Sequence, residues 1–231
     1  MENHGLSNKE LERVLKFQGY GNKNGPYWFG GMEEGGGSVG ELQKRAEKFG
    51  PVEFLHSSLD KIGLDTMYLH VPTWRIMSKL IMAMQRKPGW EETKSARDYQ
   101  ANKLGRGDGD TFLTELMPLP SRSTGVWPYP SIYPTRAEYY EAIRPGRIKW
   151  LSSEISSARP SFVICYGKGN WHHYEKIFPN IKFKSELDEN IRVGQGKHGT
   201  ILLLPFFSYY LVTKSLIKQI ANLFGRRHNE G

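Results

Sequence analysis

The sequence has almost no cysteine and no long apolar run. Its 231 residues include a single cysteine, Cys165, which excludes an intramolecular disulfide and leaves no Cys-x-x-Cys pair for zinc. No apolar run approaches the roughly 20 residues that a membrane-spanning helix needs, and residues 1–10 lack the apolar stretch of a signal peptide. These absences predict a soluble protein of the reducing cytoplasm.

Several common catalytic and phosphate-binding motifs are also absent. The chain has no Gly-x-x-x-x-Gly-Lys-Ser/Thr sequence, and no expected strand is followed by Gly-x-Gly-x-x-Gly. Ser208 is not part of a Gly-x-Ser-x-Gly elbow, which argues against a serine hydrolase. His172 and His173 are adjacent, so on a helix they point about 100° apart and do not form a metal pair.

Positive charge and aromatic side chains are what the sequence has in excess. The formal net charge is +8, and aromatic residues make up 13% of the chain. This combination favours a polyanionic partner, with nucleic acid the commonest, because bases stack on aromatic rings. The alternative is a basic enzyme with scattered lysines.

The pattern of apolar residues predicts one α/β domain over residues 1–231, with strands and helices in alternation. Residues 1–25 form its N-terminal helix and lead-in, and residues 225–231 form a loose basic tail. Strands are expected at 27–32, 111–116, 161–166 and 200–204. Helices are expected at 7–18, 38–48, 74–86 (capped by Thr73), 91–104, 135–158 (in two pieces, broken at Pro145–Gly146), 170–178 and 213–224.

Alternating strands and helices favour a parallel sheet, and ligands bind such sheets beyond the carboxyl ends of the strands. Four loops are expected there: 33–37, 115–124, 167–171 and 205–210. The first belongs to the segment Gly30–Gly37 (GGMEEGGG), in which glycines allow a close backbone approach. Its Glu33 and Glu34 are therefore candidates for catalysis rather than solvated loop carboxylates.

Taken in order, the four regions resemble the uracil-DNA glycosylase superfamily over residues 26–224. Phe29–Gly35 (FGGMEEG) stands where that family has its first glycine motif. Phe112–Glu115 (FLTE), with Met117–Ser121 (MPLPS), is similar to its second strand and proline-rich loop. Arg159–Lys168 resembles its Arg-Pro motif, and Pro205–Ser208 stands in place of its His-Pro-Ser motif.

The resemblance implies a fold and a reaction. The fold is a three-layer α/β/α domain with a central, mainly parallel four-stranded sheet. The reaction is hydrolysis of the N-glycosidic bond of a nucleotide flipped out of DNA, which leaves an abasic site. DNA is the implied partner, and no metal, no cofactor, no membrane and no obligate protein partner is needed.

The resemblance also implies roles for individual residues. Glu33 is the first candidate for the catalytic carboxylate and Glu34 the second. The candidates for base recognition are Glu115, Tyr27, Trp28 and Phe206. The candidates for DNA contact are Ser121, Arg122, Ser123, Lys168, Ser208 and Tyr209. The side chain that fills the space of the flipped base is expected to be Tyr209, Tyr210 or Leu211. Alternatively, these three residues pack in the core.

Three departures from the family pattern bear on the substrate. Glu33 replaces the usual Asp or Asn, Glu115 replaces the base-reading Asn, and Phe206 replaces the His. An ionised carboxylate accepts hydrogen bonds only, so Glu115 suits the exocyclic amine of a cytosine-derived base. The chain in this respect resembles phage-restricting bacterial glycosylases that remove glucosylated hydroxymethylcytosine.

Three alternatives remain open at the level of sequence. The chain is also compatible with a repair glycosylase for uracil or another deaminated base. A degenerate, purely nucleic-acid-binding member of the family would equally lack the His and the Asp or Asn. A hydrolase of free nucleosides on a similar sheet is the third, although the basic charge and the proline-rich loop favour a polymer.

Overall fold

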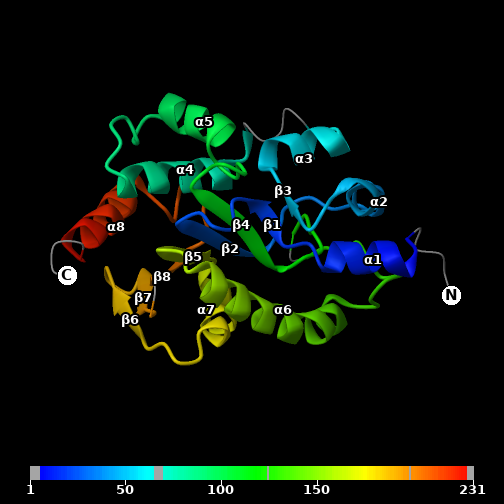
Figure 1. Cartoon of the computed structure of the whole chain (residues 1–231). Coiled ribbons are helices and arrows are strands. Elements are labelled where there is room, and N and C mark those ends of the chain that lie inside the picture. The colour runs from blue at the N-terminus through cyan, green and yellow to red at the C-terminus, as the bar shows by residue number, and fades with distance from the viewer. Residues whose placement is uncertain (1–5, 65–69, 124, 198, 228–231) are drawn as a thin grey trace.

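The fold is a mixed β-sheet with helices on both faces (Figure 1). The computed structural model describes residues 6–64, 70–123, 125–197 and 199–227. The strand order is β3-β1-β4-β2-β5-β8-β7-β6. The strands are β1 Gly19–Gly21, β2 Tyr27–Glu33, β3 Val52–Glu53, β4 Thr111–Met117, β5 Phe162–Tyr166, β6 Phe183–Glu186, β7 Ile191–Gln195 and β8 Thr200–Leu204.

Four neighbouring strands in the middle of the sheet run parallel. β2 pairs in parallel with both β4 and β5, and β5 pairs in parallel with β8. Their sequences are almost continuously apolar, as in TILLL of β8, because both faces of these strands are covered. Their carboxyl ends meet at one edge of the sheet, and this edge is where a ligand site is expected.

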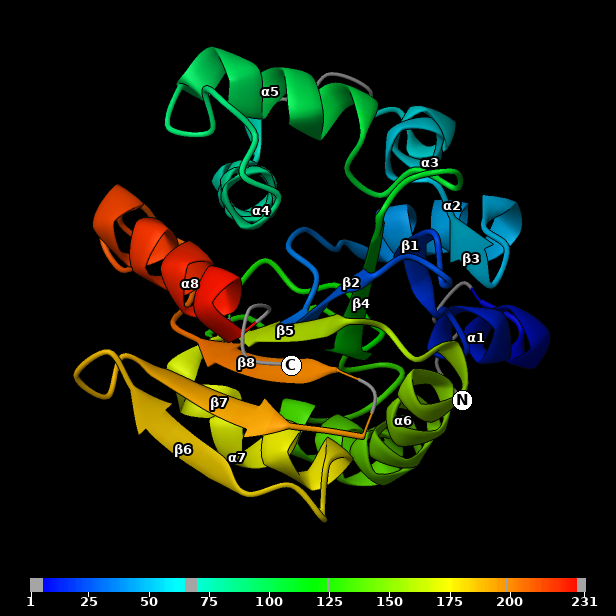
Figure 2. The same cartoon turned by 60° about the vertical axis from the view of Figure 1, so that its left-hand side comes forward.

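Helices cover both faces of the sheet (Figure 2). A hydrophobic core lies between the sheet and the helices on each face. One core packs against α3 (Leu55–Ile62), α4 (Pro72–Met84), α5 (Thr93–Asn102) and α8 (Lys214–Arg227). The other packs against α1 (Asn8–Leu15), α2 (Val39–Lys48), α6 (Arg136–Ala158) and α7 (Trp171–Tyr174). Short 3-10 turns at Lys168–Asn170 and Glu175–Ile177 flank α7. Among the described residues, no helix combines the length and apolarity that crossing a membrane requires.

The α/β class is confirmed, but the expected four-stranded sheet is wrong. Over the described residues the sheet has eight strands and is mixed, because β1 pairs antiparallel with β4, β7 with β8, and β6 with β7. The missed strands give little signal in the sequence. β1 is the three residues GYG, β3 is two residues long, and β6 (FKSE) carries no fully buried residue.

Several helix boundaries also differ from those expected. Thr73 does not cap α4, because Pro72 already occupies the first turn and Val71 is the N-cap residue. The expected helix 170–178 is broken into α7 and its two flanking turns. α8 continues to Arg227, past its expected end at residue 224, and residues 228–231 of the predicted tail lie outside the described part of the chain.

Helix α6 runs through Pro145 without a break, contrary to the prediction of two pieces. Its buried residues Tyr139, Arg147 and Leu151 lie on both sides of the proline at helical spacing, so one packed face spans it. Pro145 and Gly146 themselves are exposed. Packing of this face therefore outweighs the hydrogen bond that proline cannot donate.

Replacing Pro145 with alanine is expected to stabilise the fold. The P145A variant restores a helical N–H donor, and it should raise the free energy of unfolding by about 1–3 kcal/mol. Calorimetry should show a melting temperature higher by roughly 2–4 °C per kcal/mol. The neighbouring G146A variant is the matched control for helix propensity alone, with an expected gain of about 1 kcal/mol; a P145A protein no more stable than wild type would contradict the expectation.

Candidate active site

A small cavity lies at the carboxyl ends of β2 and β4, on the face of the sheet that α4 covers. Glu34, Glu115, Tyr166 and Arg147 line it with polar groups, and Phe17, Trp74 and Met77 are among its apolar walls. Its volume is about 20 Å³, which is room for roughly one water molecule. The cavity therefore brings two of the three candidate carboxylates together in a closed space.

Glu115 is the most unusual ionisable group of this cavity. It lies on β4 opposite Gly31 of β2, and the Tyr166 hydroxyl donates a hydrogen bond to its Oε1 at 3.1 Å. Its Oε2 is buried and has no hydrogen-bond partner among the described residues. Burial, followed by the nearby charge of Glu34, raises the pKa of Glu115 to about 8. The side chain is therefore predominantly protonated at neutral pH and can both donate and accept.

Gly31 makes room for this carboxyl group. A Cβ atom at Gly31 would lie 2.1 Å from Glu115 Oε2 and 2.4 Å from the Tyr166 hydroxyl oxygen. Real Cβ atoms do not approach other atoms that closely, so the pair requires glycine at this register position. The first glycine motif thus positions Glu115 as well as carrying carboxylates of its own.

Glu34 is held by a buried arginine. The Arg45 guanidinium on α2 donates to both oxygens of Glu34, with Nη1 at 2.8 Å from Oε2 and Nη2 at 3.0 Å from Oε1. The Tyr20 hydroxyl donates a further hydrogen bond to Oε2 at 2.8 Å. The Arg45 side chain is only 5% exposed, and Nη2 also contacts Glu41 at 2.9 Å. Glu34 is therefore oriented by three hydrogen bonds, two of them from a cation, at the edge of the cavity.

The triple glycine serves this same network. Gly37 has a φ of 94°, its N–H donates to Glu41 Oε2 at 2.9 Å, and a Cβ there would lie 2.3 Å from the Pro120 carbonyl oxygen. Gly36 has a φ of 103°, a conformation that costs other residues energy. The glycines let the chain turn tightly from β2 into α2, with Ser38 accepting the N-cap hydrogen bond from the Glu41 N–H.

Glu33, the first candidate from the sequence, is absent from the residues that line the cavity. Its Oε2 lies 2.6 Å from Arg136 Nη1 at the start of α6, and its side chain is 8% exposed. Burial raises the pKa of Glu33, while Arg136 and the Tyr140 hydroxyl act in the opposite direction. Glu33 therefore belongs to a contact between the sheet and α6.

Arg136 also fixes the proline-rich loop. Its Nη2 donates to the Ser121 hydroxyl at 2.8 Å and to the Ser123 carbonyl at 2.6 Å. The Ser121 N–H donates to the Glu34 carbonyl at 2.8 Å, and Ser121 is buried. Ser121 thus has a loop-stabilising position, whereas Arg122 and Ser123 are exposed and accessible to a DNA backbone.

The remaining candidates for DNA contact lie in the loops after β5 and β8. Lys168 is exposed, with its Nζ 5.4 Å from the centre of the Trp171 ring. Ser208 is half-buried, and its carbonyl accepts from the Val212 N–H. The Tyr209 hydroxyl accepts a hydrogen bond from Arg75 at 2.9 Å while the residue stays 47% exposed.

The loop after β8 presents a cluster of exposed apolar side chains. Phe206 is 52% exposed, Tyr210 93% and Leu211 54%. The Phe206 ring lies 6.2 Å from the ring of Tyr166, which connects this loop to the cavity. The alternative placement of Tyr209, Tyr210 and Leu211 in the core is wrong, because all three are exposed.

Tyr27 and Trp28 are not brought to the cavity. Both are buried at the amino end of β2, the opposite end of the strand from Glu33. Tyr27 stacks on Phe162, and the Trp28 indole donates to the Lys23 carbonyl at 3.1 Å. Their surroundings are those of core aromatics.

Sequence reasoning misses Tyr166, Arg147, Arg45 and Trp74. Tyr166 is the last residue of β5, so its place at a carboxyl strand end is a usable signal. Arg45 and Arg147 each lie on a helix that carries further basic residues, such as Lys48 on α2 and Lys149 on α6. Nothing in such a sequence distinguishes a buried arginine from a surface one.

Larger hollows lie elsewhere in the described part of the chain, and one of about 880 Å³ has Arg86, Lys87, Glu91, Glu92 and Lys218 in its lining. A groove of about 300 Å³ lies at the amino ends of β5 and β8 beside α8, and its lining includes no acidic or basic residue. Within the described ranges, no group of three or more His, Cys, Asp or Glu is arranged to hold a metal ion. His173 contacts Arg144 at 3.0 Å, and burial lowers its pKa to about 4.

The sequence matches no model of a protein family, and no curated protein matches it either.

The close approach of Glu115 to Gly31 predicts the effect of one added methyl group. The G31A variant should displace the Glu115–Tyr166 pair and lower the free energy of unfolding by about 1–3 kcal/mol, because the site is already filled. Gly35 provides the control, since a Cβ added there would have nothing within 4 Å. Thermal unfolding of G35A should stay within about 0.5 kcal/mol of wild type; equal stability of G31A and G35A would contradict the geometry.

The Arg45–Glu34 pair predicts a non-additive mutant cycle. R45M leaves a largely buried carboxylate without its partner and should cost about 3–5 kcal/mol. Adding E34Q removes that charge, so the R45M/E34Q double variant should be more stable than R45M alone. Urea unfolding of the single and double variants measures this coupling, and strictly additive effects would show that the pair is not coupled.

Proposed function

We propose that this chain is a DNA glycosylase that hydrolyses the N-glycosidic bond of a flipped, modified pyrimidine and leaves an abasic site. The observation that carries the proposal is Glu115: a buried carboxyl group with a free oxygen, protonated at neutral pH, in a cavity at the carboxyl ends of parallel strands. The resemblance to uracil-DNA glycosylases and the net charge of +8 support a nucleic-acid substrate.

The two cavity carboxylates are suited to different roles. Hydrolysis of a glycosidic bond needs an acid for the leaving group and a negative charge near the cationic sugar. Glu115, with its raised pKa, is the acid and donates a proton to the departing base. Glu34, paired with Arg45, is the carboxylate that faces the sugar and accepts a proton from the attacking water. Carboxylates with such divergent environments are typical of acid–base pairs.

The step balances with water as the only co-reactant. The C1′–N bond breaks, its electron pair leaves with the base, and the Glu115 proton neutralises that base. Water adds to C1′ and gives its proton to Glu34. Proton return from Glu34 to Glu115 through solvent restores the resting state.

The cavity must open for this reaction. At about 20 Å³ it holds roughly one water molecule, so a nucleobase enters only when its walls move apart. Phe17 and Trp74 are half-buried aromatic walls, and they are positioned to stack on a base that enters.

Exposed aromatic residues support duplex binding and base flipping. Extrusion of a nucleotide costs a few kcal/mol, and an inserted side chain offsets part of that cost. Tyr210 and Leu211 are exposed on the loop after β8 and are the candidates for insertion. Exposed Arg122, Ser123 and Lys168 are the candidates for phosphate contact.

For the substrate, we propose a hypermodified cytosine such as glucosylated hydroxymethylcytosine of phage DNA. A protonated Glu115 donates to N3 of cytosine and accepts from its N4 amine. The sequence predicts an ionised Glu115 that only accepts a hydrogen bond from the exocyclic amine; the protonated carboxyl group proposed here also donates one. A protonated carboxyl also pairs with O4 and N3–H of uracil, so selectivity must come from the C5 substituent.

Neutralising Glu115 is the direct test of the chemistry. E115Q keeps the shape of the side chain but cannot donate an acidic proton, and base release should fall by about 10²–10⁴-fold. DNA binding should remain close to wild type in a filter or fluorescence assay. E47Q, on the exposed side of α2, is the matched control. E33Q separates the two assignments, because a loss of activity in E33Q but not in E115Q would return the catalytic role to Glu33.

The same chemistry predicts a pH dependence. Because the protonated form of Glu115 is the active one, the rate should fall as the pH rises through about 8, and it should fall about tenfold per unit beyond that point. Initial rates of abasic-site formation between pH 6 and 10 measure this limb. A rate that rises across this interval would contradict the general-acid role.

A substrate panel decides between the remaining functions. Phage DNA with hypermodified cytosine, plain DNA, uracil-containing DNA and a free modified nucleoside are incubated side by side, and abasic sites or released base are measured. Release from modified phage DNA alone is expected. Activity confined to uracil DNA would overturn the substrate, activity confined to the nucleoside would overturn the DNA partner, and binding without any release would identify a non-catalytic DNA-binding protein.

A further inference from the structure

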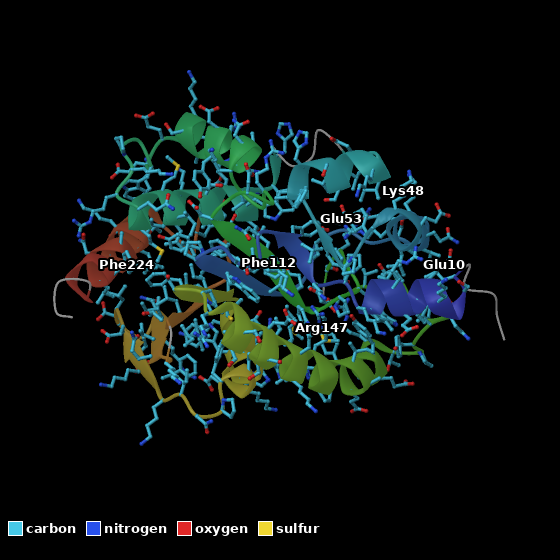
Figure 3. All side chains as sticks on the ribbon, in the orientation of Figure 1. Glu10, Lys48, Glu53, Phe112, Arg147 and Phe224 are labelled. Atoms are coloured by element: carbon cyan, nitrogen blue, oxygen red, sulfur yellow. The ribbon has the colours of Figure 1, made fainter. Side chains whose placement is uncertain are left out.

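One buried cation at the cavity is not used by the proton transfers described above. Arg147 lies on α6 between that helix and the sheet (Figure 3), and it is among the residues that line the cavity. Its Nη2 donates to the Glu115 carbonyl at 2.7 Å and its Nη1 to the Phe17 carbonyl at 3.0 Å. Its Nε donates to the Leu116 carbonyl at 3.3 Å. One guanidinium therefore binds the main chain on two sides of the cavity.

These carbonyl groups lie where the sheet is incomplete. β1 pairs with β4 only at Phe112 and Leu113, so β4 continues past the point where this neighbour ends. Buried carbonyl oxygens need a donor, and the fork of an arginine supplies several in one plane. Arg147 thus replaces a missing strand beside Glu115 and joins β4 to the connection between α1 and β1.

The charge of Arg147 is not neutralised by a neighbouring carboxylate. Among the described residues it makes no ion pair, and its guanidinium lies 4.2 Å from the centre of the Trp150 ring. Burial lowers the pKa of Arg147 to about 10, so the side chain is still charged at neutral pH. Its positive charge acts on Glu115 and favours the ionised form of that carboxyl group.

We propose that Arg147 is a positioning residue that holds Glu115 in place at the cavity and stabilises the negative charge left on it after proton transfer. This inference rests on the proposed function for its catalytic part only. The bridging geometry and the electrostatic effect on Glu115 are properties of the folded chain with or without that activity.

The charged and titratable groups around Glu115 come from four elements. Glu33 is the last residue of β2 and Glu34 comes directly after it, and the charges of both raise the pKa of Glu115. On β5, Tyr166 donates to it, and Cys165 lies close enough that Glu115, in addition to burial, raises the pKa of the thiol to about 12. Tyr174 of α7 is likewise influenced by Glu115. Arg147 of α6 is the cation that acts on Glu115 within this set.

The test follows the titration of Glu115 directly by carbon-detected NMR of protein labelled at the glutamate carboxyl carbons, with E115Q to assign the signal. In wild type the midpoint is expected near pH 8. R147M removes the charge and should move that midpoint to higher pH. K149M removes an equal charge from the exposed side of α6 and should leave it in place.

A second variant separates position from charge. R147K keeps the charge but cannot bridge three carbonyl oxygens. Its Glu115 midpoint should stay close to wild type, while base release should fall by about 10²-fold through misplacement of the carboxyl group. If R147M does not fold, R147K still decides, because R147K with the wild-type rate would overturn the positioning role.

The two proposals fail separately. A folded R147M protein with an unmoved Glu115 midpoint overturns the role of Arg147, whatever the activity. Wild-type protein that releases no base from any DNA, but shows the expected midpoint shift in R147M, overturns the glycosylase function and leaves the electrostatic role of Arg147 standing.

Discussion

The bidentate pair between Arg45 and Glu34 is the contact on which the site depends. It joins the end of β2 to α2, and through Tyr20 it reaches β1. The carbonyl of the same Glu34 accepts from Ser121, so the proline-rich loop is fixed to this point as well. A largely buried guanidinium is costly unless its donors are satisfied, and here Glu34, Glu41 and Tyr20 together satisfy them. The tight turn at Gly36 and Gly37 brings Glu34 and Glu41 to the same guanidinium, that of Arg45.

This network also explains why two carboxyl groups can share one small space. Glu34 is compensated by Arg45, whereas Glu115 is buried beside that negative charge and its pKa rises. Two uncompensated carboxylates that line the same small cavity would repel each other in a medium of low polarity. Burial and charge pairing thus place chemically similar side chains in different environments, and the proposed division of roles between them follows from that difference.

The sequence is informative wherever the local pattern determines the structure. The buried strands β2, β4, β5 and β8 and the capped start of α2 are predictable, because apolar runs and capping residues are local signals. The short strand β1 pairs with β4, and β3 pairs in turn with β1, so both depend on partners that are distant in the sequence. Pro145 is tolerated because α6 is packed on both sides of it. The choice between Glu33 and Glu34 is beyond the sequence for a similar reason. Glu33 is the last residue of β2 and contacts α6, while Glu34 follows the strand and contacts α2, and strand alternation no longer applies at that point.

Under the proposed function, the cost of opening the cavity would be offset by burial of the exposed apolar side chains in the loop after β8. Opening the cavity separates apolar walls such as Trp74 and Met77, and flipping a base breaks its stacking, so both steps are unfavourable alone. Tyr210 is 93% exposed, and Phe206 and Leu211 are more than half exposed, so this loop leaves apolar surface in contact with water. Under the proposed function, transfer of this surface into a base stack would be favourable by about 25 cal/mol per Å², and a base that entered the cavity would restore contacts to its walls. Phe206 belongs to the exposed loop, and its ring lies 6.2 Å from that of Tyr166 at the cavity, so the loop and the cavity are in contact through these aromatic residues. Under the proposed function, this coupling would restrict flipping to a nucleotide whose base fits beside Glu115.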